Sequence, residues 1–217
     1  IKRNEVEMTN SGFEFAVKYI SCDMVGGDMY DIIDTPDHVL FYVFDVSSHG
    51  ILSALIAAIF KSLLQMLKYL PYCSENTENF NKCIQNINKE LFLNTSQDTF
   101  ATLFIGYINK RNSKLTYISA GHIPQYILNN NQLIELNSTG PLLGVLENLT
   151  FSVNDVYLES GNKLLLFTDG IIDVPHENVS YGTNNFKTLI LNNSHLNSKQ
   201  LLNTLLDEVS HYCDMPS

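Results

Sequence analysis

The feature that most constrains the fold is a change in hydrophobic periodicity near residue 50. Before it, residues 13–20 alternate apolar and polar side chains, and residues 28–33 and 39–46 follow as a hairpin around a Pro-containing turn, as strands do. After it, residues 50–70 repeat apolar side chains at three- and four-residue steps, which predicts a long, heavily buried helix ended by Pro71. The apolar stripe of that helix comprises Leu52, Leu55, Ile56, Ile59, Leu63, Met66 and Leu67.

The rest of the chain continues this mixture of strands and helices. Ser74 is expected to begin a second helix, with Glu75 and Glu78 in its first turn. Strands joined as hairpins, with the helices segregated in sequence, predict an α+β fold. The stripe of the second helix is Phe80, Cys83, Ile84, Ile87 and Leu91. The further elements expected are three hairpins, at 99–108 with 115–119, at 126–128 with 133–136 and at 151–158 with 163–168, and two helices at 184–191 and 198–212.

Length and composition describe one globular domain. The 217 residues, 45% hydrophobic and 17% charged, suffice to bury a core without disulfide or zinc staples. The longest apolar run, 51–60, has about half the length of a membrane span, and no signal-peptide pattern opens the chain. Because the chain begins at Ile1, we expect a single domain over residues 1–217 that is a fragment of a longer protein.

Cysteine and charge usage narrow the setting and the partners. Cys22, Cys73, Cys83 and Cys213 form no CxxC pair, which favours reduced thiols and a cytoplasmic protein over a zinc site. The formal net charge of −10 and the scattered basic residues disfavour nucleic acids and membrane surfaces as partners. An acidic protein can still act on phosphate where metal ions invert the local field.

Three aspartates stand where apolar strands begin or end. Asp28 follows two glycines at the start of a strand, while Asp45 and Asp169 each end a strongly apolar one. A carboxylate at the tip of a buried strand is costly to desolvate unless a cation or hydrogen-bond donors meet it. If the three converged at one end of a sheet or sandwich, they would suit Mg²⁺ or Mn²⁺. Each could instead cap a turn or a helix, Asp45 in particular the helix expected near residue 50.

Five segments follow one another in an order that resembles the signatures of one family. From about residue 13 to 212 the chain is similar to PPM-type (PP2C-like) bacterial serine phosphatases, and most similar to their SpoIIE/RsbU subgroup. The resemblance implies an α/β/β/α sandwich, with two antiparallel sheets flanked by helices. The segments are Val25-Gly26-Gly27-Asp28-Met29-Tyr30-Asp31, Phe44-Asp45-Val46-Ser47-Ser48-His49-Gly50, Ala120-Gly121-His122-Ile123-Pro124, Gly140-Pro141-Leu142-Leu143-Gly144 and Phe167-Thr168-Asp169-Gly170.

The resemblance also implies a metal-dependent protein-serine/threonine phosphatase. In the family, the aspartates matching Asp28, Asp45 and Asp169 and the backbone carbonyl matching Val46 hold two divalent cations, Mn²⁺ or Mg²⁺. These cations share a bridging water, lower its pKa and present hydroxide in line to phosphorus. The implied substrate is a phosphorylated regulatory protein, such as an anti-sigma-factor antagonist, and the implied regulator is an N-terminal sensor or receiver domain.

The chain departs from the family pattern at several positions. Phe44 and Ser48 replace glycines, and the bulk of Phe44 is expected to narrow the metal site. No acidic pair opens a last strand before Ser217, and Asp214 is not counted as that ligand, so either the protein continues or the second metal binds weakly. These departures favour an alternative, a catalytically weak pseudophosphatase that binds its phosphoprotein or another partner as a scaffold.

Other residues near the motifs are candidates for supporting roles. His49 could orient a water or the phosphate, or make a capping or supporting hydrogen bond. Gly170, within the last motif, is a further candidate for a supporting role. Asp173, three residues later, could hold metal-bound waters, and Asp31 could do the same or be a solvated strand residue. His122, in a Gly-His-x-Pro turn, is expected to lock a loop rather than perform chemistry.

Overall fold

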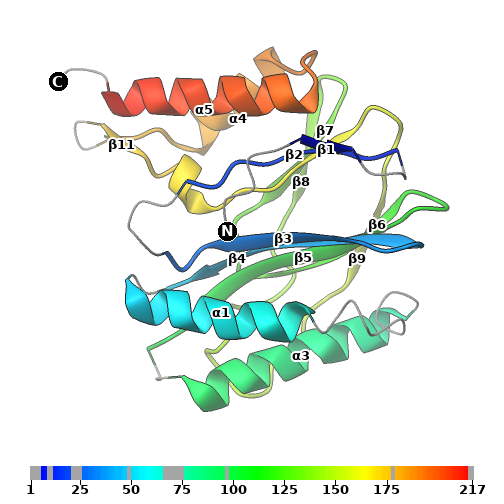
Figure 1. Ribbon diagram of the computed structural model, residues 1–217, viewed down its shortest axis with the longest axis vertical. Helices are drawn as coiled ribbons and strands as arrows, with labels where there is room; N and C mark the ends of the chain where they lie inside the picture. Colours follow the sequence, from blue (N-terminus) through cyan, green and yellow to red (C-terminus); the bar gives the residue numbers. More distant parts are fainter. Residues whose placement is uncertain are drawn as a thin grey trace. The chain divides into compact units, whose positions relative to one another are not determined.

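The computed structural model of the chain describes residues 6–8, 12–20, 26–47, 50–65, 76–95, 98–176 and 179–214. The chain divides into two compact units, each built from antiparallel strands and helices (Figure 1). The predicted α+β class is therefore confirmed. We call the two units the large-sheet unit, which comprises Ser21–Pro124 and Leu136–Leu158, and the small-sheet unit, which comprises Ile1–Ile20, Gln125–Glu135 and Glu159–Ser217.

The large-sheet unit is a five-stranded antiparallel sheet with two helices on one face (Figure 1). Its core lies between that face and the helices, where side chains of the sheet and of both helices are buried together. The strands, in their order across the sheet, are β3 (Met29–Asp34), β4 (His38–Val46), β5 (Ala101–Asn109), β6 (Lys114–Ala120) and β9 (Asn154–Tyr157). The helices are α1 (Ile51–Gln65) and α3 (Thr77–Asn94).

Strand β4 divides its side chains between the two faces of this sheet. Even-numbered residues from Leu40 to Val46 belong to the core shared with the helices. Phe44 stacks on Phe60 of α1, with ring centroids 4.5 Å apart. Successive strand residues point to opposite faces, so the odd-numbered residues, ending in Asp45, face away from α1. The expectation that Phe44 narrows a site at Asp45 is therefore wrong, because the two side chains lie on opposite faces.

Helix α1 buries only part of its predicted stripe. Of that stripe, Ile56 is buried and Leu63 is partly buried against the core, whereas Leu55 and Ile59 are 58% and 60% exposed. The other buried side chains, Phe60 and Leu64, lie outside the predicted stripe. The apolar residues of α1 cover more of its circumference than the one row that a helix lying on a sheet can bury. The prediction of a heavily buried helix is thus wrong for that second row, and the predicted stop at Pro71 lies outside the described residues.

Helix α3 begins at Thr77, with Asn76 as its N-cap. The Asn76 side chain accepts a hydrogen bond from the Glu78 backbone N–H at 2.8 Å. Ser74 and Glu75, where the sequence places the start of this helix, lie outside the described residues. Four residues of the predicted stripe are buried, namely Phe80, Ile84, Ile87 and Leu91.

A buried asparagine of α3 holds the loop that follows Gly140. The amide nitrogen of Asn88 donates to the carbonyls of Leu146 and Glu147, at 2.9 and 3.0 Å. Its amide oxygen accepts from the Gly144 N–H at 2.9 Å. Asn88 is fully buried, and these hydrogen bonds offset the cost of desolvating its amide.

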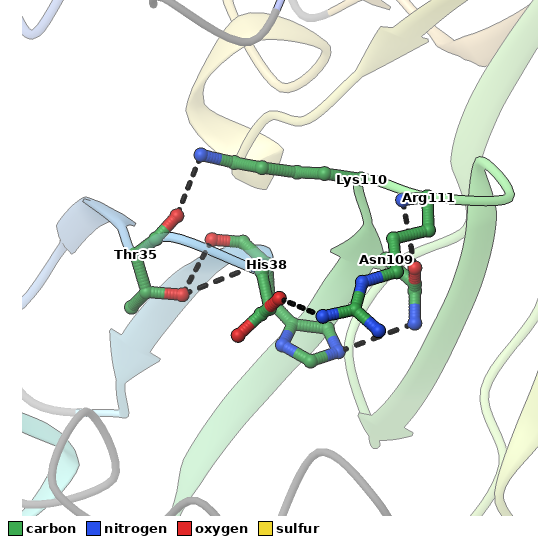
Figure 2. Close-up of polar contacts among 6 residues, drawn as sticks. Thr35, His38, Asn109, Lys110 and Arg111 are labelled. Carbon is green, nitrogen blue, oxygen red and sulfur yellow. Dashed lines mark hydrogen bonds and ion pairs between the residues drawn. The ribbon is translucent and has the colours of Figure 1, made fainter.

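The two hairpin turns at the sheet end farthest from Asp45 are joined by side chains (Figure 2). Lys110 Nζ donates to the Thr35 carbonyl at 2.6 Å. Asn109 Nδ2 lies 3.4 Å from His38 Nε2, and its side-chain oxygen accepts from the Arg111 N–H at 2.9 Å. These contacts connect the β3–β4 turn to the β5–β6 turn, and so they support the register of the three strands that carry the site.

The third predicted hairpin is wrong. Strand β9 pairs with β6, whereas β10 (Lys163–Leu165) pairs with β7 (Gln125–Asn129) in another sheet. The intervening turn does form, since the Asn162 N–H donates to the Glu159 carbonyl at 3.1 Å and Gly161 has φ +87°. Turn residues predict the local backbone conformation. Which neighbouring strand a strand pairs with is set instead by hydrogen-bonding partners that are remote in sequence.

Asp155 of β9 gives the sheet edge a small pH dependence. Its burial raises the pKa of its carboxyl, but the Thr116 hydroxyl and Lys114 Nζ, 2.9 Å away, outweigh burial and lower it below 3.8. A lowered pKa stabilises the fold above the unfolded-state pKa, and this contribution is lost as the pH falls through the folded-state pKa.

Asp155→Asn is therefore expected to remove at most about 1 kcal/mol of unfolding free energy near neutral pH, because the carboxyl is largely solvated. The difference from the wild type should shrink below pH about 4. Urea unfolding of both proteins across this pH range measures it, and a difference that grows on acidification would contradict the assignment.

The small-sheet unit has a three-stranded sheet in the order β10-β7-β8, with β8 at Gln132–Leu136. The predicted closing helices are confirmed as α4 (Thr183–Asn192) and α5 (Ser198–Asp214). The strand predicted over 13–20 is shorter, as β2 (Glu14–Ala16), and pairs with β1 (Val6–Met8). A two-residue ladder joins β11 (Pro175–His176) to β12 (Val179–Ser180). The buried core residues of the small-sheet unit are Tyr126, Leu128, Tyr181, Phe186, Ile190, Leu201, Leu205 and Val209.

Within the ranges given above, no helix combines the length and the hydropathy that crossing a bilayer requires.

Candidate metal centre

The register of β3 and β4 brings two of the three predicted aspartates together. Their ladder ends at the pair Met29↔Phe44, and one further residue on each strand places Asp28 opposite Asp45. Directly opposed residues of antiparallel strands put their side chains on the same face, with Cβ atoms about 4.5–5.5 Å apart. Both aspartates are half-buried. Two like charges so placed repel each other unless a cation lies between them.

The Val46 carbonyl lies at the same end of the sheet. The Ser47 N–H donates to the Phe100 carbonyl at 2.9 Å, so the backbone groups of Val46 point away from β5 and toward the β3 side. On that side of β4, a Cβ atom added to Gly27 would lie 3.1 Å from the Val46 carbonyl oxygen and 3.1 Å from Ser53 Cβ. A glycine before Asp28 therefore permits a close approach that a side chain would crowd.

These residues suit a hard divalent cation. Two carboxylates and a backbone carbonyl are all oxygen donors, which Mg²⁺ and Mn²⁺ prefer over nitrogen or sulfur. The Val46 carbonyl lies beyond the last β3–β4 pair, and Gly27 packs closely against Val46 because it has no side chain. The large-sheet unit thus supplies three candidate ligands, from Asp28, Asp45 and Val46.

Asp45 does not occupy the N-cap position of α1. It lies within β4, one residue before the strand ends, while Gly50 directly precedes the helix with φ +80°. The Ser53 hydroxyl donates to the Gly50 carbonyl at 2.8 Å within the first turn. His49, the predicted supporting residue between them, lies outside the described residues, as does Ser48.

Asp31 faces away from the aspartate pair. It lies opposite Tyr42 on the face that carries α1, and its carboxylate is 4.0 Å from Lys61 Nζ. Burial, and secondly the charge of Asp31, raise the pKa of the Tyr42 hydroxyl. Asp31 therefore has a structural partner of its own, and the suggestion that it holds waters of the metal site is not supported.

Asp169 belongs to the small-sheet unit, at the start of a 3₁₀ turn, η2 (Asp169–Ile171). The N–H groups of Ile172 and Asp173 both donate to its carbonyl, each at 2.8 Å. Asp169, Gly170 and Asp173 are all exposed, and the Asp173 N–H closes the turn on the Asp169 carbonyl. The role of Asp173 in holding metal-bound waters stays a prediction.

A buried glutamine fixes the strand that leads to Asp169. Gln125 Nε2 donates to the Phe167 carbonyl at 3.0 Å, and the Phe167 N–H donates to Gln125 Oε1 at 2.7 Å. The side chain thereby takes the place of a neighbouring strand after β10 has ended at Leu165. Gln125 is completely buried. Sequence analysis missed this residue, since a single glutamine after a Gly-His-x-Pro turn carries no distinctive pattern.

The motif histidine lies at the aspartate end of the large sheet. His122 is 4% exposed, and its Nδ1 is 2.6 Å from Thr102 Oγ1 of β5. Gly121, with φ +60°, donates its N–H to the Gly140 carbonyl at 2.9 Å. The third and fourth motifs are therefore joined to each other and to β5, and the prediction that His122 locks a loop is confirmed.

The candidate ligands thus fall into two groups. Asp28, Asp45 and Val46 belong to the large-sheet unit, and Asp169, Gly170 and Asp173 to the small-sheet unit. Among the residues that the structure describes, no three His, Cys, Asp or Glu side chains form a group suited to a metal ion. The meeting of all three aspartates around cations stays a prediction.

The sequence was compared with family models. The model described as Stage II sporulation protein E (SpoIIE) matches residues 35–216, most of the chain. The chain belongs to the SpoIIE family. The resemblance drawn from the five motifs is therefore confirmed.

Individual relatives agree with this membership. Protein IcfG of Synechocystis sp. is 33% identical over 172 residues, which make up 69% of this chain and 27% of that protein. Phosphoserine phosphatase RsbU of Bacillus subtilis is 26% identical over 161 residues, 73% of this chain and 46% of RsbU. The chain therefore spans less than half the length of either relative.

Solved structures support the PP2C-like fold of this SpoIIE-family chain. The SiaA-PP2C domain of Pseudomonas aeruginosa matches with a TM-score of 0.75 and 19% identity, over 88% of this chain and 76% of that one. RsbX in complex with magnesium matches with a TM-score of 0.62 and 18% identity, over 89% of this chain and 83% of RsbX. At these identities the likeness shows the fold alone.

Proposed function

We propose that this SpoIIE-family chain is a metal-dependent protein-serine/threonine phosphatase. The observation that carries the proposal is the opposition of Asp28 and Asp45 beside the Val46 carbonyl, against which Gly27 packs closely. RsbU is named a phosphoserine phosphatase, and RsbX was solved with magnesium, which supports the same chemistry for this chain.

The proposed roles divide among the motif residues. Asp28, Asp45 and the Val46 carbonyl would hold Mn²⁺ or Mg²⁺, with Asp169 as the third carboxylate. The bound cations, two in the family's pattern, would lower the pKa of a water and offset the charge of the phosphate ester. Asp173 and His49 would orient waters or phosphate oxygens by hydrogen bonds, and the exposed Gly170 backbone leaves room beside Asp169.

The proposed substrate is a phosphoserine or phosphothreonine of a regulatory protein, such as an anti-sigma-factor antagonist. Kinship with RsbU supports this class of substrate. Because the matched region is a minor part of the relatives, we further propose that a regulatory or sensor domain acts on this one in the cytoplasm.

The competing candidate is a pseudophosphatase that binds a phosphoprotein without efficient hydrolysis. Ser48 in place of the family's glycine favours it. Phe44 no longer does, because its ring packs on Phe60 away from Asp45. Calorimetric titration with Mn²⁺ separates the candidates: two binding sites favour the enzyme, and none favours the scaffold.

Hydrolysis of a phosphoserine peptide in Mn²⁺ buffer tests the proposal. We expect phosphate release that EDTA abolishes and that excess Mn²⁺ restores, because the carboxylates alone cannot attract a dianionic ester. Phosphate release unchanged by EDTA would contradict the metal-dependent mechanism. Absence of both hydrolysis and Mn²⁺ binding would instead favour the pseudophosphatase.

A further inference from the structure

Thr102 is the cross-strand neighbour of Asp45. The β4–β5 ladder pairs Asp45 with Thr102, and Asp28 lies on the other side of Asp45. Side chains of directly opposed residues share a face, with Cβ atoms about 4.5–5.5 Å apart. The Thr102 side chain therefore lies on the same face of the sheet as the Asp45 carboxylate.

The position of the Thr102 side chain is set by His122. The 2.6 Å contact between Thr102 Oγ1 and His122 Nδ1 is a hydrogen bond whose direction depends on the histidine tautomer. Threonine has two heavy atoms on Cβ, so its χ1 angle has few allowed values, and one strong hydrogen bond selects among them. His122 thus determines which edge of Thr102 is presented to Asp45.

The backbone that carries His122 is itself firmly held. The Gly121 N–H donates to the Gly140 carbonyl at 2.9 Å and to Ser138 Oγ at 3.1 Å. A Cβ on Gly121 would lie 2.5 Å from a Leu142 side-chain carbon, so this turn is closely packed. The imidazole therefore projects from a rigid turn, as a group that orients another side chain must.

The neighbouring residues on the same face are apolar. The ladder pair next to Asp45 and Thr102 on this face is Val43↔Phe104, and both residues are buried. Burying the Thr102 hydroxyl and the His122 imidazole at the edge of such a surface costs free energy of hydration. This cost is offset when the two groups hydrogen-bond to each other or to a nearby charged group.

We propose that Thr102 and His122 are positioning residues for the Asp45 carboxylate. His122 fixes the Thr102 side chain next to Asp45. Thr102 in turn holds the Asp45 carboxylate in the orientation that faces Asp28 and the Val46 carbonyl before a cation enters. The inference rests on the proposed metal-dependent function. Removing a residue that orients a metal ligand typically lowers metal affinity by about 10–100-fold.

The test is Mn²⁺ affinity measured by calorimetry on the folded chain, with Thr102→Val as the principal variant. Valine keeps the shape and the β-branching but removes the hydroxyl, so we expect Mn²⁺ affinity to fall about 10-fold or more. Thr102→Ser restores the hydroxyl and should bind Mn²⁺ within about 3-fold of the wild type. His122→Leu should resemble Thr102→Val, while His122→Asn, which keeps a polar group near the Nδ1 position, should lose less affinity.

Thr116→Val is the matched control. Thr116 lies in the same sheet and its hydroxyl also bonds a partner, Asp155, so the variant loses the same kind of hydrogen bond away from the site. It should melt at a lower temperature with unchanged Mn²⁺ affinity.

The outcomes separate the two levels of inference. Absence of Mn²⁺ binding by the wild type overturns the proposed function. Normal wild-type binding with equal binding by Thr102→Val overturns the positioning role alone. Loss of affinity that Thr102→Ser does not restore, or that Thr116→Val shares, also overturns it, because the threonine would then serve only stability.

Discussion

Asp45→Asn is expected to lower kcat/KM on a phosphoserine peptide by about 10³-fold or more, equivalent to about 4 kcal/mol of transition-state stabilisation. Asparagine has the shape of aspartate but is neutral, so the pair with Asp28 would lose half of its charge for a divalent cation. Asp169→Asn is expected to cause a loss of the same order. The rate of phosphate release in saturating Mn²⁺, with circular dichroism melts to verify folding, measures both effects.

Asp34→Asn provides the control for these variants. Asp34 is the last residue of β3, the strand that begins directly after Asp28. It lies at the opposite end of the sheet, where its carboxylate pairs with Lys110. The variant should keep activity within about twofold, because its carboxylate pairs with the largely buried Lys110 side chain far from Asp45, and distant sites act independently. Near-normal activity of Asp45→Asn would dispose of the mechanism. Loss in Asp45→Asn but not in Asp169→Asn would remove Asp169 from the site and leave the large-sheet residues in place.

Gly144→Ala is expected to lower the unfolding free energy by about 3 kcal/mol or more. Gly144 has φ +86°, a conformation that costs a non-glycine residue about 1–2 kcal/mol. An added Cβ would also lie 2.9 Å from the Thr99 carbonyl oxygen and 2.8 Å from Leu91 Cδ2. Relief of these contacts would move the loop away from Asn88, whose amide oxygen accepts the Gly144 N–H. Urea unfolding followed by circular dichroism measures the loss.

Gly161→Ala separates backbone strain from steric crowding. Gly161 has nearly the same backbone angle, φ +87°, but an added Cβ would meet no atom within 4 Å. This variant should therefore lose only about 1 kcal/mol, from the strained backbone alone. Equal losses in the two variants would show that the packing around Gly144 tolerates a methyl group.

The glycines of the third and fourth motifs thus have a structural explanation. Gly121, Gly140 and Gly144 each lie where a Cβ would approach another group within 2.5–2.9 Å. Isolated bridges join Ala120 to Gly140 and Ala101 to Leu143. These motifs hold together the loops at the aspartate end of the large sheet, so their signature reflects close packing as much as chemistry.

Much of the local structure was predictable because it follows from side-chain periodicity. The strand at 39–46 and the helix at 198–212 were placed within two residues of β4 and α5. Asn130 adopts φ +53° in the turn between β7 and β8, a left-handed conformation that asparagine tolerates. The same reasoning failed for the exposed row of α1 and for the pairing of β9, because both depend on what lies beside the element.

The amino-acid sequence by itself determined where the strands and helices of this protein run, the family to which it belongs and the three aspartates worth testing. Only the tertiary structure decided that Asp28 opposes Asp45, that Thr102 pairs with Asp45 and contacts His122, and that Gln125 fixes the segment before Asp169. The physical reason is that hydrophobic period is a property of neighbouring residues along the chain. The register of an antiparallel ladder is fixed instead by hydrogen bonds between distant residues, and these leave no trace in local sequence.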